Sequence, residues 1–268
     1  MELGRALTFV FRDPRWVRKL GIAVLLGLPS AALGLLFSER FGDVLLAGGV
    51  LPTLLGLLPS LLSVPLLGYA LRVARNAAAG TDLPLPEWDD PGGLLRDGLK
   101  AWGVVTLWTF PVLLAGLVGD FPPGMAEGRG VTTPLVLAVL ATLLLSVVEP
   151  AAETRLAVSG SFVAGLDVAA AFRTVGRNLG GYVLIVLVFV AGSAVAGGVG
   201  AGVLLLAWIT AGGQPDTLDA IGLGGAIVTT LFGPYGRLVL YHLYGQAYRQ
   251  ANGRPPSAPP RDDQVGRW

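Results

Sequence analysis

The stretch NLGGYVLIVLVFVAGSAVAGGVGAGVLLLAWITAGGQP, residues 178–215, contains no charged side chain. A helix needs about 20 residues to cross a hydrocarbon core about 30 Å thick, and this stretch is longer than that. A helix that is apolar on every side has no face to turn toward water. We therefore predict that residues 178–215 contain a transmembrane helix.

Five further stretches lack charged residues and have a similar composition. They are Leu20–Ser38, Val44–Leu71, Ala101–Gly119, Gly130–Val148 and Ala220–Gly236. Of the 268 residues, 53% are hydrophobic and 14% are charged, against about 25% charged in an average soluble domain. The mean hydropathy is +0.67. The predicted fold class is therefore all-α, a polytopic transmembrane helix bundle with six spans.

Basic residues are unevenly distributed among the connections between these spans. Sixteen of the 19 Lys and Arg residues lie in the two termini and in the second and fourth connections. Because cytoplasmic segments carry the excess of Lys and Arg, we predict both termini in the cytoplasm, beneath a plasma membrane. The outer connections are short and join the spans into three hairpins, at Glu39–Asp43, Asp120–Arg129 and Gly212–Asp219.

The transmembrane domain predicted from these spans covers residues 1–251. The remaining residues, 252–268, hold four prolines among polar side chains. Proline-rich polar segments favour extended conformations and form no packed core. We predict a disordered cytoplasmic tail.

A short amphipathic stretch precedes each hairpin. In each stretch, three apolar residues recur at i, i+4 and i+7 with charged residues beside them. They are Leu3, Leu7 and Val10; Leu95, Leu99 and Trp102; and Val168, Phe172 and Val175. Such a face suits a short helix that lies in the head-group region of the cytoplasmic leaflet. The alternative is that these stretches are cytoplasmic extensions of the spans.

The composition excludes several kinds of chemistry. The chain has no Cys, which excludes disulfides, thiolate metal sites, iron–sulfur clusters and cysteine catalysis. His242 is the single histidine, so a multi-histidine metal or haem site is excluded as well. The net charge of +1 argues against a nucleic-acid partner. We assign no catalytic residue, metal or cofactor, and expect no enzyme activity.

Small residues repeat within the stretch 178–215. Gly192, Ala196 and Gly200 follow one another at four-residue spacing, a pattern that allows two membrane helices to approach closely. We predict that this face packs against a neighbouring helix. One alternative is an unwound substrate-binding segment of the kind found in transporters. The other is a phosphate-binding loop, which the chain does not support because no strand precedes it.

Three charged residues near the cytoplasmic ends of the fourth and sixth spans form a candidate polar cluster. Glu149 and Glu153 lie one helical turn apart, and Arg237 follows the sixth span. An Arg at the bilayer centre costs about 2.5–3.5 kcal/mol, so it is expected to be paired or to reach the surface. We predict that Arg237 meets Glu149 or Glu153; the alternative is contact with lipid phosphates. The carboxylate pair suits proton or cation binding, and equally a wet interfacial face.

Prolines interrupt two of the predicted spans. Pro52, Pro59 and Pro65 lie in the second span, and Pro234 lies in the sixth. Proline removes a backbone donor and kinks a helix, and broken helices bind substrates in transporters. Prolines are also tolerated in membrane helices that bind nothing, so both interpretations stay open.

Five segments carry a resemblance to a known family. They are FRDPRW (11–16), GYALRVAR (68–75), PLPEWDD (84–90), DGLKA (97–101) and LYGQAY (243–248). In these segments the chain resembles the uncharacterised prokaryotic membrane proteins of the DUF4013 family. The resemblance implies a multi-pass membrane protein and provides neither an activity nor functional residues.

The features above favour a non-enzymatic membrane scaffold that binds a protein partner or lipid. The alternative is a transporter or permease-like protein with its site at the Gly- and Pro-broken spans, although the spans hold few of the ionisable residues that mark a transport pathway. An intramembrane enzyme fits least, because no acid–base or nucleophile–base constellation lies at membrane depth. The expected partners are membrane lipids and either another protein or a second copy of the chain.

Overall fold

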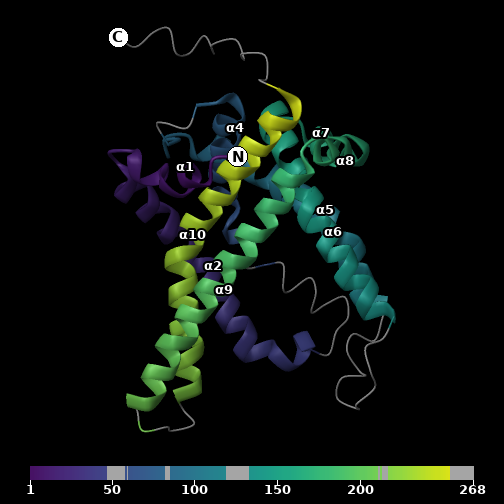
Figure 1. Ribbon diagram of the computed structural model, residues 1–268. Coiled ribbons are helices and arrows are strands. Elements are labelled where there is room, and N and C mark those ends of the chain that lie inside the picture. The colour runs from purple at the N-terminus through teal and green to yellow at the C-terminus, as the bar shows by residue number, and fades with distance from the viewer. Residues whose placement is uncertain are drawn as a thin grey trace.

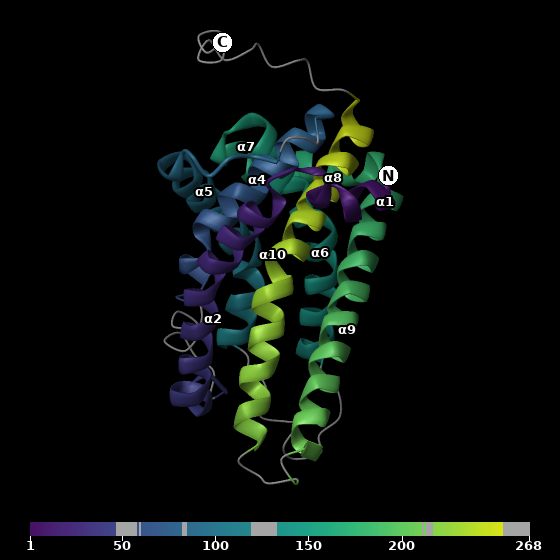
Figure 2. The same cartoon turned by 90° about the vertical axis from the view of Figure 1, so that its left-hand side faces the viewer.

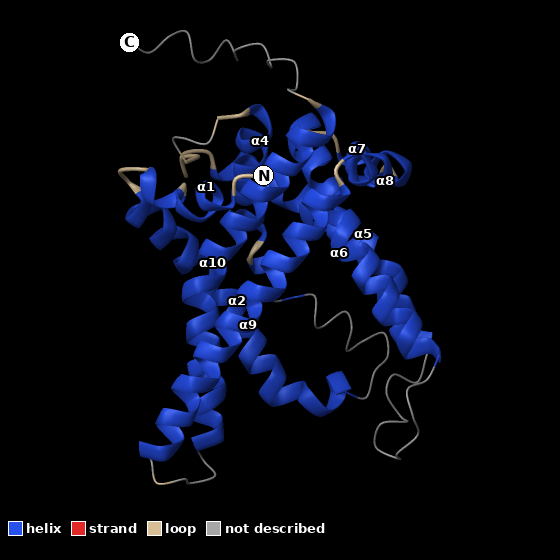
Figure 3. Ribbon diagram, viewed as in Figure 1, coloured by secondary structure: helices blue, strands red, loops and turns tan. Residues whose placement is uncertain are grey.

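The computed structural model describes residues 1–46, 58, 60–81, 85–118, 133–210, 212 and 217–253, and these residues form helices and no strand (Figures 1 and 3). This confirms the all-α prediction. In chain order the helices are α1 (Leu3–Thr8), the 3₁₀ turn η1 (Val10–Arg12), α2 (Trp16–Leu46), α4 (Val64–Ala79), α5 (Pro91–Val118), α6 (Thr133–Ser159), α7 (Phe162–Leu166), α8 (Val168–Arg177), α9 (Leu179–Thr210) and α10 (Thr217–Asn252).

The helices meet at one end of the molecule and extend away from it. The short helices α1, α4, α7 and α8 lie at this end, together with the N-terminus and the C-terminal end of α10 (Figures 1 and 2). From there α5 and α6 extend side by side, α9 and α10 extend as a second pair, and the two pairs diverge (Figure 1). We call the shared end the hub: α4 and the parts of α5, α6 and α10 that pack on it.

Small residues allow the helix backbones of the hub to touch. A Cβ atom added at Gly68 of α4 would overlap the carbonyl oxygen of Leu94 in α5. A Cβ atom at Gly98 would overlap the carbonyl oxygen of Val64, and one at Gly245 of α10 would overlap backbone and side-chain atoms of α4. At these three positions only glycine fits without a backbone shift.

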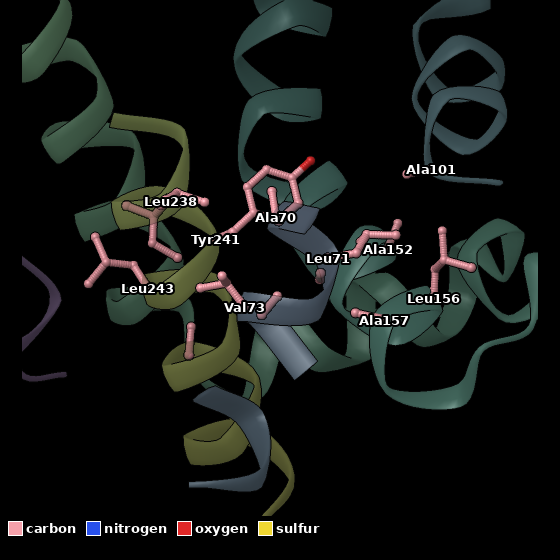
Figure 4. Close-up of a cluster of buried hydrophobic side chains, with 14 of the residues drawn as sticks. Ala70, Leu71, Val73, Ala101, Ala152, Leu156, Ala157, Leu238, Tyr241 and Leu243 are labelled. Atoms are coloured by element: carbon pink, nitrogen blue, oxygen red, sulfur yellow. The ribbon is translucent and has the colours of Figure 1, made fainter. Parts of the chain in front are cut away.

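Apolar side chains from three helices fill the space beside these crossings. Ala70, Leu71 and Val73 of α4 lie between α6 and α10 in Figure 4. The residues that meet them are Ala152, Leu156 and Ala157 of α6 and Leu238, Tyr241 and Leu243 of α10. All are buried, so the hub has a packed core of its own.

The long helices, by contrast, expose apolar side chains. Among the described residues, two helices are long and apolar enough to cross a membrane, Trp16–Gly34 and Leu179–Thr210, and only 11% of the most apolar part of each is buried in the protein. The helices α5, α6 and α10 contain most of three more predicted spans, 101–119, 130–148 and 220–236, and each of these includes residues whose side chains lie outside the described part.

One predicted connection is wrong, because charged residues end an apolar stretch without ending the helix. The outer connection expected at Glu39–Asp43 is helical, and α2 continues through it to Leu46. Glu and Arg are good helix formers, so their charge need not interrupt the backbone pattern. Helix α4 continues beyond Leu71, the last residue of the second predicted span, as far as Ala79, and this is compatible with the span. The connection Asp120–Arg129 and the tail from residue 254 lie outside the described residues.

The prolines also differ in their roles. Pro65 stands in the first turn of α4, where its missing N–H is harmless, and therefore begins a helix instead of interrupting one. Pro234 lies inside α10, which continues through it as one helix. Pro52 and Pro59 lie outside the described residues.

The amphipathic stretches take three forms. The first is divided between α1 and η1, and Val10 turns into the core while Leu7 stays exposed. The second is the beginning of α5, which continues without a break into the predicted span 101–119, so the prediction of a separate helix is wrong there. The third is a separate helix, α8, which ends at Arg177 and is followed by the C-cap residue Asn178 before α9.

The glycine crossings generate a first prediction. Gly98→Ala should lower the free energy of unfolding by about 1–3 kcal/mol, because the added methyl group overlaps the Val64 carbonyl oxygen. Gly92→Ala, on the same helix, is the matched control, since nothing lies within 4 Å of its Cβ position. Thermal unfolding of both variants in detergent measures the difference. Equal melting temperatures for the two would contradict backbone contact at this crossing.

Candidate functional site

A buried ion pair joins the N-terminal arm to the loop before α5. Asp13 and Lys19 are 1% and 3% exposed, and Lys19 Nζ lies 2.9 Å from Asp13 Oδ2. Lys19 Nζ also donates to the carbonyl oxygen of Leu85 (2.7 Å), and the Leu85 N–H donates to Asp13 Oδ2 (2.8 Å). Both buried charges therefore have the paired and hydrogen-bonded environment that burial requires.

The local sequence around Asp13 explains its position. Asp13 precedes α2, and its Oδ1 atom accepts a hydrogen bond from the Arg15 N–H (2.7 Å). This hydrogen bond between residues two apart forms an Asx turn, which fixes the backbone immediately before the first residue of α2. Lys19 follows within the first turns of α2, where its side chain can reach back to the same carboxylate.

The charge of Asp13 is stabilised by these contacts. Burial raises the pKa of the Asp13 carboxyl, but the hydrogen bonds from Lys19 and from the backbone amides of Arg15 and Leu85 outweigh it, so the pKa lies below the ordinary value of 3.8. Asp13 is therefore ionised at neutral pH. Because its folded-state pKa is lowered, the stability it contributes is present above pH 3.8 and is lost as the pH falls through the folded-state value.

An aromatic pair extends this contact to α4. The rings of Tyr69 and Trp88 are stacked, with centroids 4.1 Å apart and planes at 2°. The Tyr69 hydroxyl donates to the carbonyl oxygen of Pro86 (2.9 Å), and Trp88 Nε1 donates to the carbonyl oxygen of Lys19 (3.2 Å). Glu87 lies 2.7 Å from Lys19 Nζ. The N-terminal arm, the loop and α4 therefore form one connected unit.

A second group of charges joins α4 to α5 and α6. Arg72 pairs with Asp90 at 2.7 Å, and the buried Asp97 lies 3.9 Å from both Arg72 and Arg75. Arg75 Nε also donates to the carbonyl oxygen of Ala157, in the last turn of α6. Free carbonyl groups at the end of a helix favour a cation. The two arginines therefore connect three helices of the hub.

The predicted cluster of Glu149, Glu153 and Arg237 lies between α6 and α10 at the edge of the hub. Glu153 is buried and has one carboxyl oxygen, Oε2, without a hydrogen bond in the described part of the chain. Glu149 and Arg237 are partly buried. These described residues contain no ion pair between Arg237 and either glutamate, although the charge of Arg237 acts on Glu153. The pairing stays a prediction.

The environment of Glu153, which lies beyond the predicted span 130–148, favours a neutral carboxyl. Burial raises its pKa, and the nearby carboxylate of Glu149 raises it further. The nearby Tyr241 hydroxyl and the charge of Arg237 lower the pKa only in part. A carboxyl in this environment binds a proton more readily than one in water.

The small-residue repeat of α9 is only partly covered. Gly192 is exposed, Ala196 is half-buried and Gly200 is buried. No atom of the described residues lies within 4 Å of a Cβ added at Gly192 or Gly200. Helix α9 does pack on α10, but close backbone contact at these glycines stays a prediction.

The sequence predicts no contact for Asp13, Lys19 or Tyr69, and it indicates only an interfacial anchor for Trp88; these four residues hold the arm and loop in place. Asp13, Tyr69 and Trp88 lie in segments that carry the family resemblance, whereas Lys19 does not. The one local signal is a carboxylate and an amine six residues apart immediately before an apolar helix.

A comparison with known protein families gives a match that covers the hub helices α4, α5 and α6. The family model described as "Protein of unknown function (DUF4013)" matches residues 51–206, which is more than half of the chain. The chain belongs to the DUF4013 family. The DUF4013 match includes α4 to α8 and most of α9, whereas Asp13, Lys19 and the α10 side of the hub lie outside it. No curated protein and no solved structure matches the chain.

The buried ion pair generates the second prediction. Lys19→Met leaves the Asp13 carboxylate buried without its cation, and should lower the free energy of unfolding by about 3–5 kcal/mol. Combining it with Asp13→Asn should recover part of this loss, because no unpaired charge remains. A double-mutant cycle on thermal unfolding at pH 7 measures the coupling.

The exposed Arg12→Gln, on the same arm, is the control and should leave the melting temperature unchanged. Additive losses for Asp13→Asn and Lys19→Met would contradict the pair.

Proposed function

We propose that the chain is an integral membrane protein with six spans and both termini in the cytoplasm, and that it acts as a non-enzymatic scaffold that binds partner proteins or lipids at its cytoplasmic hub. The observation that carries this proposal is the segregation of surface chemistry: polar networks occupy the hub, and exposed apolar side chains cover the helices that extend from it.

The apolar surface of α9 supports the membrane part of the proposal. Its 32 residues span about 48 Å, longer than a hydrocarbon core of about 30 Å. Along it Leu187, Val195 and Leu206 are 59%, 67% and 64% exposed. Water solvates such a surface poorly, whereas lipid chains cover it at no cost.

The short helices support the position of the membrane surface. Helix α1 runs across α10 in Figure 2, and α7 and α8 project sideways from the hub in Figure 1. On α8, Val168 and Phe172 are 52% and 43% exposed, and Arg173 and Arg177 are exposed beside them. An apolar face flanked by arginines suits the boundary between lipid chains and anionic head groups.

The scaffold function is supported by how the charges of the hub are used. Arg72, Arg75, Asp97 and Lys100 are engaged in contacts within the protein: three in ion pairs, and Lys100 in a 2.7 Å hydrogen bond to the carbonyl oxygen of Gly160. Such contacts fix the relative positions of helices. A rigid platform with exposed helices at its rim is suited to hold a partner at the membrane.

A transporter is the second candidate function, and the buried carboxyl of Glu153 is the feature that favours it. A buried carboxyl with an oxygen that lacks a hydrogen bond, one turn from Glu149, is the type of group that binds a proton during coupled transport. Glu153 follows Pro150, which lies inside α6 and has no N–H group to donate a backbone hydrogen bond there.

The topology is the third prediction. A reporter enzyme that is active only outside the cytoplasm should give signal when inserted after Gly124 and none when fused at Trp268. The reason is the distribution of arginines, which places the second and fourth connections with the termini. Silence after Gly124, or signal at Trp268, would contradict the six-span arrangement.

The fourth prediction separates scaffold from transporter. Proteoliposomes with an enclosed pH dye should show the same proton flux, close to that of empty vesicles, for the wild type, Glu153→Gln and Glu149→Gln. A flux that needs the wild-type protein and is abolished by Glu153→Gln would overturn the scaffold proposal in favour of transport. Glu149→Gln is the matched control, since it removes the neighbouring carboxylate and keeps the buried one.

A further inference from the structure

A pocket of about 190 Å³ lies where α2 begins and the loop before α5 ends. Its lining includes charges of both signs: Arg15 immediately before α2, Arg18 in the first turn of α2, and Glu87 and Asp89 from the loop. Ile22 and Trp88 provide apolar surface beside them. Its volume is below that of pockets for drug-sized molecules, which are about 300–1,000 Å³, so it suits a small polar group.

The charges of this pocket fall into two groups. Lys19, Glu87 and Arg15 are joined by ion pairs, and Lys19 is buried against Asp13 as described above. Arg18 and Asp89 differ from these. Both are exposed, and neither forms an ion pair or hydrogen bond with the other or with any further residue that the structure describes. The pocket therefore presents one available cation and one available anion.

The balance of charge restricts the ligand. Three cations (Arg15, Arg18 and Lys19) and two anions (Glu87 and Asp89) line the pocket, and the charge of Lys19 is also paired with Asp13, which lies outside the lining. A purely anionic ligand would meet Arg18 but would be repelled by Asp89. A ligand with one negative and one positive group satisfies both side chains at once.

The apolar side of the pocket indicates where such a ligand comes from. Arg18, Ile22 and Leu25 stand at i, i+4 and i+7 and therefore share one face of α2. Ile22 lines the pocket, and Leu25 is 64% exposed further along the helix. This face belongs to the membrane-length segment Trp16–Gly34. Acyl chains attached to a head group in the pocket would lie along it.

We propose that this pocket binds the head group of an amine-bearing zwitterionic phospholipid. The phosphate contacts the Arg18 guanidinium, which suits phosphate oxygens, and the ammonium donates to the Asp89 carboxylate. Trp88 lies at the level of the glycerol, where aromatic residues are common in membrane proteins. This inference rests on the proposed membrane location of α2.

Native mass spectrometry of the detergent-solubilised full chain tests the proposal. The protein is incubated with equal amounts of phosphatidylethanolamine, phosphatidylcholine and phosphatidylglycerol. The wild type should retain one phosphatidylethanolamine in preference to the others, because the quaternary ammonium of phosphatidylcholine cannot donate a hydrogen bond to Asp89 and phosphatidylglycerol has no cation.

Two variants should each reduce this retention about tenfold: Arg18→Gln and Asp89→Asn. Asp89→Asn should in addition raise the retention of phosphatidylglycerol. Arg12→Gln, an exposed arginine of the same arm that does not line the pocket, should change nothing. Melting temperatures of all three should match the wild type, since the altered side chains are exposed.

Equal retention of the three lipids, or retention unaffected by Arg18→Gln and Asp89→Asn, would overturn the proposal. Displacement of the lipid by an equal concentration of soluble phosphoethanolamine would also overturn it, because the ligand would then be a solute. These outcomes are separate from a failure of the topology test, which would remove the membrane location itself.

Discussion

The constraint on which this structure depends is that helix α9 and the first part of α2, Trp16–Gly34, are apolar over membrane-spanning lengths and are mostly not buried in the protein. Helix α9 has so little polar surface that it cannot lie between a protein core and water, and only a small part of it is buried. Under the proposed arrangement, lipid covers this surface. All strong polar interactions then have to lie where the helices leave the bilayer, because an unpaired polar group within it would cost several kcal/mol.

The hub meets this requirement in two ways. Close backbone contact at Gly68, Gly98 and Gly245 brings α4 against α5 and α10 without large side chains between them. Near these contacts the buried charges of Asp13 and Lys19 are paired with each other, and Arg75 donates to the carbonyl oxygen of Ala157 in the last turn of α6. The glycines set the distances between helices, and the ion pairs then fix the loop and the N-terminal arm. The proposed lipid pocket lies on this arm, at the boundary of the two environments.

The sequence predicts part of this organisation. Uncharged stretches identify the apolar helices, since composition alone decides which solvent suits them. The ends of the helices are harder to predict from the sequence. Glu39 and Arg40, for example, end an apolar stretch, but α2 continues through them. The contact of Asp13 and Lys19 with Leu85 could not be predicted from the sequence either, because Lys19 and Leu85 are 66 residues apart. The four-residue spacing of Gly192, Ala196 and Gly200 leads to the prediction of a helix contact at that repeat. The glycines at the helix crossings of the hub are single residues that belong to no repeat. Their importance depends on which helix lies opposite, and local pattern does not contain that information.

The most direct test of the central claim, that lipid covers the exposed face of α9, uses the absence of cysteine from the chain. Single cysteines introduced at Val183, Leu187, Val195 and Leu206 are spin-labelled, and the protein is reconstituted in bilayers. Collision with oxygen, which concentrates in the hydrocarbon, is compared with collision with a water-soluble nickel chelate. The account predicts the highest ratio of oxygen to nickel at Val195, near the middle of the helix, with lower ratios towards Val183 and Leu206. Nickel collisions at Val195 as frequent as at a label on the exposed Arg18 would contradict it.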